Sequence, residues 1–141
     1  MALGYVVRQE PAGHETRQKE PAATVSASFT LCNQFSRGDC VIDGDTFYLR
    51  GQRVRIADID APQTQPARCE YEQELAEQAT RRLLDWLNAG PFSLEPWEER
   101  DEDAYGRKLR AVVRDGNSLG SVLVSEGLAR EWSGRPLPWC D

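Results

Sequence analysis

Histidine and long apolar runs are almost absent from this sequence. The single histidine, His14, lies in an N-terminal stretch without apolar periodicity, so we do not expect imidazole to bind a metal ion or to act as a catalytic base. No run of about 18 apolar residues occurs, so we expect no membrane-spanning helix. The first apolar residues are interrupted at Arg8, before they reach the length of a signal-peptide core, so they are not recognisable as an export signal.

Positive charge is also in short supply. The 141 residues contain 17 Lys and Arg against 23 Asp and Glu, which gives a net charge of −6. This balance argues against a protein that binds nucleic acid mainly through a broad basic surface. With 40% hydrophobic residues, the chain is expected to contain one globular domain, which we place at residues 29–141. Residues 1–28 are rich in Glu, Gln, Ala, Pro, Thr and Ser and are predicted to form a disordered arm.

Two predicted strands organise the chain between residues 41 and 63. Apolar side chains alternate with others over residues 47–49 and 54–56, which is typical of half-buried strands. A short linker at residues 51–52 has the length of a hairpin turn. The pattern therefore predicts a β-hairpin.

Three aspartates lie at the ends of these two strands, at Asp43, Asp45 and Asp60. Side chains at strand ends can leave the core and converge, and three converging carboxylates repel one another unless a cation lies between them. The pattern therefore predicts a metal site. Each aspartate taken alone is equally typical of a turn or of a solvated strand end, because Asp-Gly is a common turn dipeptide.

The rest of the sequence predicts a mixed α+β fold. Apolar residues at three- and four-residue spacing indicate a long helix over residues 69–89, ended by Gly90-Pro91. The apolar face of this helix is expected to contain Tyr71, Leu75, Ala79, Leu83, Trp86 and Leu87. Further predicted elements are a first strand ending near residue 42, strands at 92–97 and 107–114, and a short helix at 118–126. These elements match a five-stranded OB-fold barrel with one long helix between strands 3 and 4 and a short C-terminal helix.

The four cysteines form an even set in a small domain, which favours disulfides. Three pairings are possible, and we favour Cys32 with Cys40, across a short loop, and Cys69 with Cys140, which would tie the C-terminal tail to the body. A zinc site is the competing interpretation, but no Cys-x2-Cys spacing occurs. Disulfides imply a periplasmic or secreted protein.

Two separated motifs carry the functional information. The first consists of Asp43-Gly44-Asp45-Thr46, Arg55 and Asp60-Ala61-Pro62, and the second is Asp103-Ala104-Tyr105-Gly106-Arg107. In this order they resemble the two signatures of the staphylococcal nuclease (thermonuclease) family. The resemblance covers residues 40–132. It implies the OB-fold barrel of that family and Ca²⁺-dependent hydrolysis of phosphodiester bonds in DNA or RNA.

The resemblance places a Ca²⁺ site at the first motif. Ca²⁺ accepts carboxylate and carbonyl oxygens in flexible geometry. We expect Asp45 and Asp60 to be direct ligands and the Ala61 carbonyl to be a third, with Asp43 as a supporting carboxylate behind them.

Substrate contacts are expected from both motifs. Arg55 and Arg107 would make bidentate contacts with phosphate oxygens and stabilise the charge that builds up in the transition state. Tyr105 would stack on or border the sugar and base, which favours single-stranded or flexible substrates. We expect the protein to be a monomer. Because its net charge is negative, we expect it to bind nucleic acid weakly and in a salt-sensitive way.

Gln63 departs from the family pattern, in which this position holds a glutamate that acts as the general base. Glutamine cannot accept a proton at neutral pH, and loss of a general base typically costs about 10² to 10⁴ in rate. Glutamine can still orient an attacking water, as it does in GTPases. Should another residue supply the base, Glu70 and Glu72 at the start of the long helix are the first candidates.

Two classes of function remain open at this point. One is a slow or specialised nuclease, and the other is a non-catalytic nucleic-acid-binding OB-fold module that has kept its phosphate pocket. A third and more remote class is a disulfide-stabilised interaction domain. The retention of Asp45, Asp60, Arg55 and Arg107 favours the nuclease, because a pure binder has no need of metal ligands.

Overall fold

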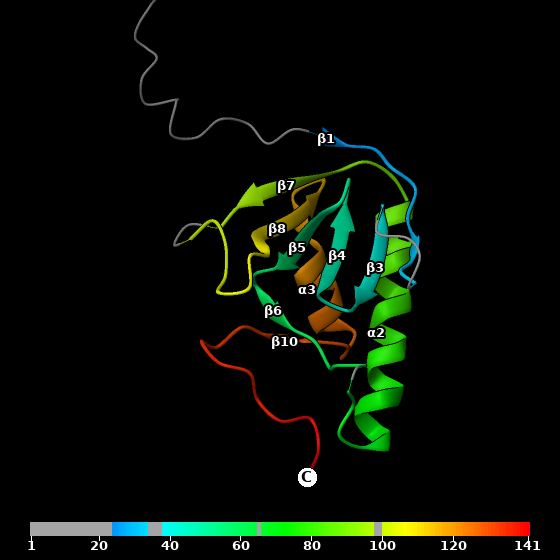
Figure 1. Ribbon diagram of the computed structural model, residues 1–141, viewed down its shortest axis with the longest axis vertical. Helices are drawn as coiled ribbons and strands as arrows, with labels where there is room; N and C mark the ends of the chain where they lie inside the picture. Colours follow the sequence, from blue (N-terminus) through cyan, green and yellow to red (C-terminus); the bar gives the residue numbers. More distant parts are fainter. Residues whose placement is uncertain (1–23, 34–37, 65, 98–99) are drawn as a thin grey trace, which may run out of the picture.

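A curled β-sheet and two helices make up the described part of the molecule, shown in Figure 1. The computed structural model describes residues 24–33, 38–64, 66–97 and 100–141. Residues 1–23 of the predicted arm, and with them His14, lie outside this part. The predicted arm extended to residue 28, but the strand Thr24–Val25 already belongs to the sheet, and Val25 is buried.

Eight strands form the main sheet. They are β1 Thr24–Val25, β2 Thr30–Leu31, β3 Cys40–Asp43, β4 Thr46–Leu49, β5 Gln52–Ile56, β7 Phe92–Pro96, β8 Lys108–Arg114 and β9 Asn117–Ser118. Their hydrogen-bonded order is β1-β7-β8-β5-β4-β3-β2, and β9 pairs with β8. A separate antiparallel pair consists of β6 Ile59–Asp60 and β10 Arg130–Glu131.

The sheet curls into a half-barrel, which is consistent with an OB-like fold (Figure 1). β1 and β2 stand at the two ends of the strand order and do not pair with each other in the described residues. Of the predicted five-stranded OB-fold barrel, the structure shows this curled half-barrel sheet. Strands of two residues flank the longer ones, and such short pieces show no sequence periodicity.

The predicted hairpin is formed by β4 and β5. Leu49 pairs with Gln52, so the turn consists of Arg50 and Gly51 and not of the residues at 51–52 that the sequence suggested. Both turn residues have positive φ, at 51° and 82°. A two-residue turn of this kind matches the right-handed twist of the flanking strands, and glycine adopts it without steric cost.

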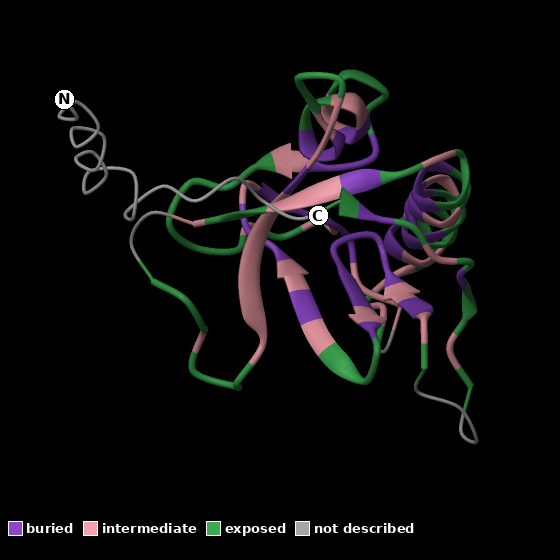
Figure 2. Ribbon diagram, turned by 90° about the horizontal axis from the view of Figure 1, so that it is seen from above, coloured by how far each residue is buried: buried purple, intermediate pink, exposed green. Residues whose placement is uncertain are grey.

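The long helix α2 (Glu70–Asn88) follows β6 and precedes β7 in the chain. Its buried face lies toward the sheet (Figure 2) and consists of Glu72, Ala76, Ala79, Thr80, Leu83, Trp86 and Leu87. Most of the predicted apolar face is confirmed, but Tyr71 is exposed and Leu75 only partly buried. Compared with the predicted face, the helix is turned so that Glu72, and not Tyr71, points inward in the first turn.

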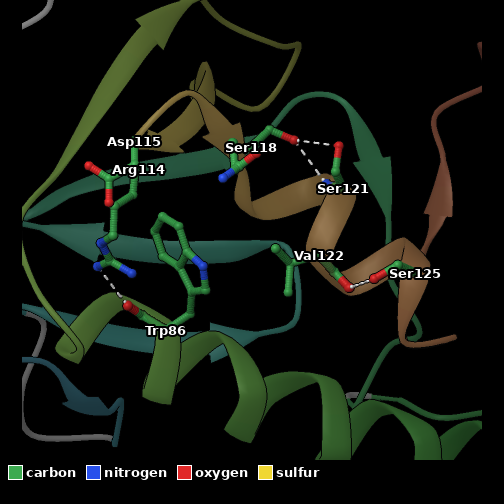
Figure 3. A pocket seen from close by; sticks show the side chains of 8 residues that line it. Trp86, Arg114, Asp115, Ser118, Ser121, Val122 and Ser125 are labelled. Atoms are coloured by element: carbon green, nitrogen blue, oxygen red, sulfur yellow. Dashed lines mark hydrogen bonds between the residues drawn. The ribbon is translucent and has the colours of Figure 1, made fainter.

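The short helix α3 (Leu119–Ser125) is capped by Ser118, whose hydroxyl accepts the Ser121 N–H (2.9 Å). Near the start of α3, the Arg114 guanidinium on β8 stacks on the ring of Trp86 at 3.8 Å (Figure 3). It also donates to the backbone carbonyl of Trp86 at 2.8 Å. A guanidinium at the end of α2 satisfies carbonyl groups that have no partner within the helix. The Arg114 contacts join β8 to the end of α2.

Both predicted disulfides are present, Cys32–Cys40 and Cys69–Cys140. They are compatible with an oxidising environment. The second closes a loop with a sequence separation of 71 residues, against 8 for the first. In the chain-entropy model these loops are worth about 4 and about 2.5 kcal/mol respectively. The longer one fixes the C-terminal tail against the start of α2.

In the described residues, no helix is long and apolar enough to cross a bilayer.

Candidate active site

Asp45 is the centre of the site and is almost fully buried, at 2% exposure. One carboxylate oxygen accepts the Thr46 hydroxyl (2.9 Å), and the other accepts the Ala61 N–H (2.9 Å). Arg55 Nη1 lies 3.6 Å from the second oxygen. Asp45 thereby brings together the β3–β4 turn, the end of β5 and the segment after β6.

Asp43 and Asp60 lie in the electrostatic field of Asp45 and are also buried. The Asp45 N–H donates to Asp43 Oδ1 at 3.2 Å. Burial, followed by the charge of Asp45, raises the pKa of Asp43 well above its usual value. The same two causes raise the pKa of Asp60, although Arg55 and the backbone N–H of Leu137 oppose the shift. The three carboxylates are therefore mutually repulsive and only partly compensated by the protein.

This cluster suits a hard cation, because buried carboxylate oxygens that repel one another are the donors that Ca²⁺ accepts. Over residues 24–33, 38–64, 66–97 and 100–141, no group of three or more His, Cys, Asp or Glu side chains is arranged to hold a metal ion. A site here would therefore draw on Asp45 and Asp60 together with backbone oxygens and water. Ala61 is buried beside them.

Gly44 lets the acidic turn approach α2 closely. A β-carbon on Gly44 would lie 2.7 Å from Cβ of Ala79 and 3.0 Å from Cβ of Ala61, closer than packed carbon atoms tolerate. The pairing of β3 with β4 also shifts its register between Val41 and Asp43. Such bulges re-aim side chains and are frequent beside active sites. The Asp-Gly-Asp sequence thus fixes the carboxylates against the helix.

Arg55, at the end of β5, connects the acidic cluster to a neighbouring cavity. Its guanidinium donates to the Ile56 carbonyl and, at 2.9 Å, to the Ile59 carbonyl, and the side chain is only 11% exposed. The ring of Trp132 lies 5.7 Å from it. Held on one side by Asp45 and bounded on the other by an aromatic ring, Arg55 is a fixed positive charge.

The second motif forms a turn organised by Asp103. Its carboxylate accepts the N–H groups of Tyr105 (2.9 Å) and Arg107 (3.0 Å) and also Nε of Arg107 (2.6 Å). Burial alone would raise the pKa of Asp103, but these N–H groups and the guanidinium lower it overall. Gly106 has φ of 82°, which explains the glycine of the motif. The Tyr105 ring, 75% exposed, lies 5.6 Å from the Arg107 guanidinium.

A cavity of about 280 Å³ joins the two motifs. Arg55 and Arg107 both line it, and so does Tyr105. The sequence did not single out Trp97 and Trp132, which also form its wall. Neither carries a local motif, and the two tryptophans come together only through the fold. Asp43, Asp45, Asp60 and Gln63 are not among the lining residues, so Arg55 is the link between the cavity and the acidic cluster.

Gln63 is half-buried, and its backbone N–H donates to Oε2 of Glu72 at 3.2 Å. The alternative bases considered from the sequence are placed differently. Glu72 is fully buried, and its other oxygen accepts the Arg68 N–H, so it is not free to activate a water. Glu70 is exposed on α2.

Fold and site together define a class: an α+β protein with an OB-like half-barrel, a buried aspartate cluster and two arginines facing an aromatic cavity. The profile of the family described as "Staphylococcal nuclease homologue" matches residues 53–136, and the chain belongs to this family. The match includes Arg55, Asp60, Gln63 and Arg107, whereas the Asp43–Asp45 turn precedes it.

Two curated relatives from Bacillus subtilis (strain 168) are similar to the chain. "Endonuclease YncB" is 37% identical over 97 residues, which cover 65% of this chain and 45% of YncB. "SPbeta prophage-derived endonuclease YokF" is 37% identical over 97 residues, which cover 65% of this chain and 32% of YokF. The chain spans less than half the length of either relative.

Proposed function

We propose that this chain hydrolyses phosphodiester bonds in DNA or RNA in a Ca²⁺-dependent reaction that Gln63 slows. The observation that carries the proposal is the placement of Arg55, which contacts the buried Asp45 and lines the cavity that Arg107 also faces. Family membership and two relatives named as endonucleases support it. The underlying fold would be the five-stranded OB barrel of the family, built on the longer strands β3, β4, β5, β7 and β8.

Asp45 and Asp60 would hold the ion together with the Ala61 carbonyl, and Asp43 would support Asp45 through the Asp45 N–H. When bound, Ca²⁺ neutralises charge on the phosphate and polarises its oxygens. The protein prepares this site by burying carboxylates whose repulsion the cation relieves.

Arg55 and Arg107 bind the scissile phosphate. Each is already fixed by a carboxylate, Asp45 and Asp103 respectively, so little conformational entropy is lost when phosphate oxygens meet the remaining N–H donors. Their charge is aimed where negative charge develops in the transition state, and such preorganised donors make a large contribution to rate.

The aromatic wall of the cavity supports a proposal about the form of the substrate. Tyr105, Trp97 and Trp132 offer ring faces beside the two arginines, and unpaired bases stack on such surfaces without sequence preference. Single-stranded or flexible DNA and RNA therefore fit better than a regular duplex. The net charge of −6 makes binding weak and sensitive to salt.

Gln63 is the residue on which the two classes of function differ most. As an amide it can orient a water molecule but cannot take its proton, so hydrolysis is slow. The alternative is a non-catalytic nucleic-acid-binding module with the same phosphate pocket, which the Gln63 substitution favours. The buried aspartate cluster favours catalysis, because binding alone does not need it.

We further propose a monomer that works in the periplasm or outside the cell, a location that suits its two disulfides.

Ca²⁺ is expected to stabilise the protein through Asp45 and Asp60. At about a hundredfold excess over Kd, one bound ion adds about 3 kcal/mol to the free energy of unfolding, which raises Tm by several degrees. Replacing both residues by Asn should abolish this shift, because the amides keep the shape but not the charge. Thermal unfolding with and without Ca²⁺ measures the effect, and Asp101→Asn, on an exposed aspartate, is the matched control. An undiminished Ca²⁺ shift in the double variant would show that the ion binds elsewhere.

A further inference from the structure

Glu72 is a charged residue on the buried face of α2. It shares this face with Ala76, Ala79 and Leu83, and its exposure is 0%. Carboxylates are rarely fully buried, because the loss of hydration is costly unless hydrogen bonds replace it. The partners of Glu72 therefore indicate what its burial achieves.

Both carboxylate oxygens of Glu72 accept backbone N–H groups from the segment that precedes α2. Oε1 accepts the Arg68 N–H at 2.8 Å, and Oε2 accepts the Gln63 N–H at 3.2 Å. Burial alone would raise the pKa of Glu72, but these two N–H groups and the Arg68 guanidinium lower it overall. Glu72 is thus a buried anion that binds the backbone N–H groups of Gln63 and Arg68.

The long disulfide covers this carboxylate. Cys140 Sγ lies 3.8 Å from Oε1 of Glu72, and its partner Cys69 precedes α2 and accepts the Glu72 N–H at 3.4 Å. The C-terminal tail is therefore pinned over the point where the loop joins the helix. With the tail in place, Glu72 has little freedom to change its hydrogen bonds.

The segment from Ala61 to Gln63 is consequently held by a carboxylate at each end. The Ala61 N–H is bound by Asp45, inside the acidic cluster, and the Gln63 N–H is bound by Glu72, on the helix. Two fixed N–H groups two residues apart determine where the intervening backbone runs. They also set the direction in which the side chain of residue 63 leaves it.

We propose that Glu72 is a positioning residue for hydrolysis, which fixes residue 63 relative to the Asp45 cluster through the Gln63 backbone N–H. This rests on the proposed function, in which residue 63 acts on the attacking water. Misplacement of a reacting group by about 1 Å can cost on the order of 10² in rate. Glu72 acts through the backbone, so it should serve equally well when residue 63 is a glutamate.

A kinetic cycle tests the proposal. Gln63→Glu should raise kcat by about 10² or more in the otherwise unchanged protein, but by less than about tenfold when combined with Glu72→Gln. KM should change little, because the phosphate arginines and the Asp45 cluster are untouched. Glu74→Gln removes a charge from an exposed position of the same helix and should leave the full gain in place. An equal gain with and without Glu72 would overturn the proposal and leave Glu72 a purely structural residue.

Amide exchange gives a readout that does not depend on catalysis. Glu72→Gln should accelerate exchange of the residue 63 N–H by about tenfold or more, while amides in the middle of α2 keep their protection. If Gln63→Glu gives no gain in any background, the base assignment fails and this measurement alone decides. Faster exchange then supports positioning, and unchanged exchange overturns it. Should Glu72→Gln not fold, Glu72→Asp withdraws the carboxylate by one methylene and permits the same comparisons.

Discussion

Replacing Gln63 by glutamate is expected to raise the rate of phosphodiester hydrolysis by about 10² or more. In our proposal the residue stands where a general base would act, while Asp45, Arg55 and Arg107 are held by the contacts described above. The substitution therefore adds a proton acceptor to a site that lacks little else. Because a base acts in the transition state and not in the ground state, kcat should rise while KM stays nearly constant. Steady-state cleavage of a single-stranded oligonucleotide measures both.

Gln52→Glu provides the control for added charge. Gln52 is an exposed glutamine at the opposite end of β5 from Arg55, and the same substitution there should leave the rate unchanged. A protein that is already as fast as a typical nuclease and indifferent to Gln63→Glu would contradict the assignment. Since Glu72 is buried and bonded to two backbone N–H groups, exposed Glu70 would then be the remaining candidate base.

Removing either of the two arginines that we propose to bind phosphate is expected to lower kcat/KM by about 10² to 10³, both in the parent and in the Gln63→Glu variant. Arg55→Ala removes the charge that links Asp45 to the cavity, and Arg107→Ala removes its counterpart in the second motif. Lysine at either position keeps the charge but not the planar fork, and should recover only part of the loss. Single-turnover cleavage rates at saturating Ca²⁺ measure these effects.

Arg110→Ala is the matched control. Arg110 pairs with exposed Asp101 at 2.9 Å and does not line the cavity, so its loss should change the cleavage rate by less than about twofold. Equal losses for Arg55, Arg107 and Arg110 would indicate a general electrostatic effect and contradict a specific phosphate site.

Elements with strong periodicity could be predicted from the sequence, and short ones could not. The β4–β5 hairpin and α2 follow from alternation and from three- to four-residue spacing, and Gly90 marks the helix end to within two residues. Strands such as β1 and β6 have two residues each and carry no period. Their pairing partners, β7 and β10, lie far away in the chain. The half-barrel form of the sheet depends on these long-range pairs.

The same distinction applies to the site. Asp43, Asp45, Arg55 and Asp60 lie near the ends of neighbouring predicted strands, so their convergence could be predicted. Trp97 and Trp132 reach the cavity only through the fold, and nothing in their neighbourhood indicates it. Glu72 did leave a signal: it falls at the spacing of Ala76, Ala79 and Leu83, where an apolar residue is expected. A charge on the apolar stripe of a helix is a reason to look for buried partners.

Cleavage of single-stranded DNA by the unaltered chain, with Ca²⁺ and with an excess of chelator, tests the central claim most directly. We expect slow cleavage that requires Ca²⁺, ceases with chelator and is lost when Asp45 and Asp60 are replaced by Asn, because we propose that the aspartate cluster and the two arginines act as one site. Cleavage that persists unchanged with chelator would contradict the metal site. No cleavage by either the parent or Gln63→Glu, with binding of the oligonucleotide intact, would contradict catalysis and identify the chain as a nucleic-acid-binding module.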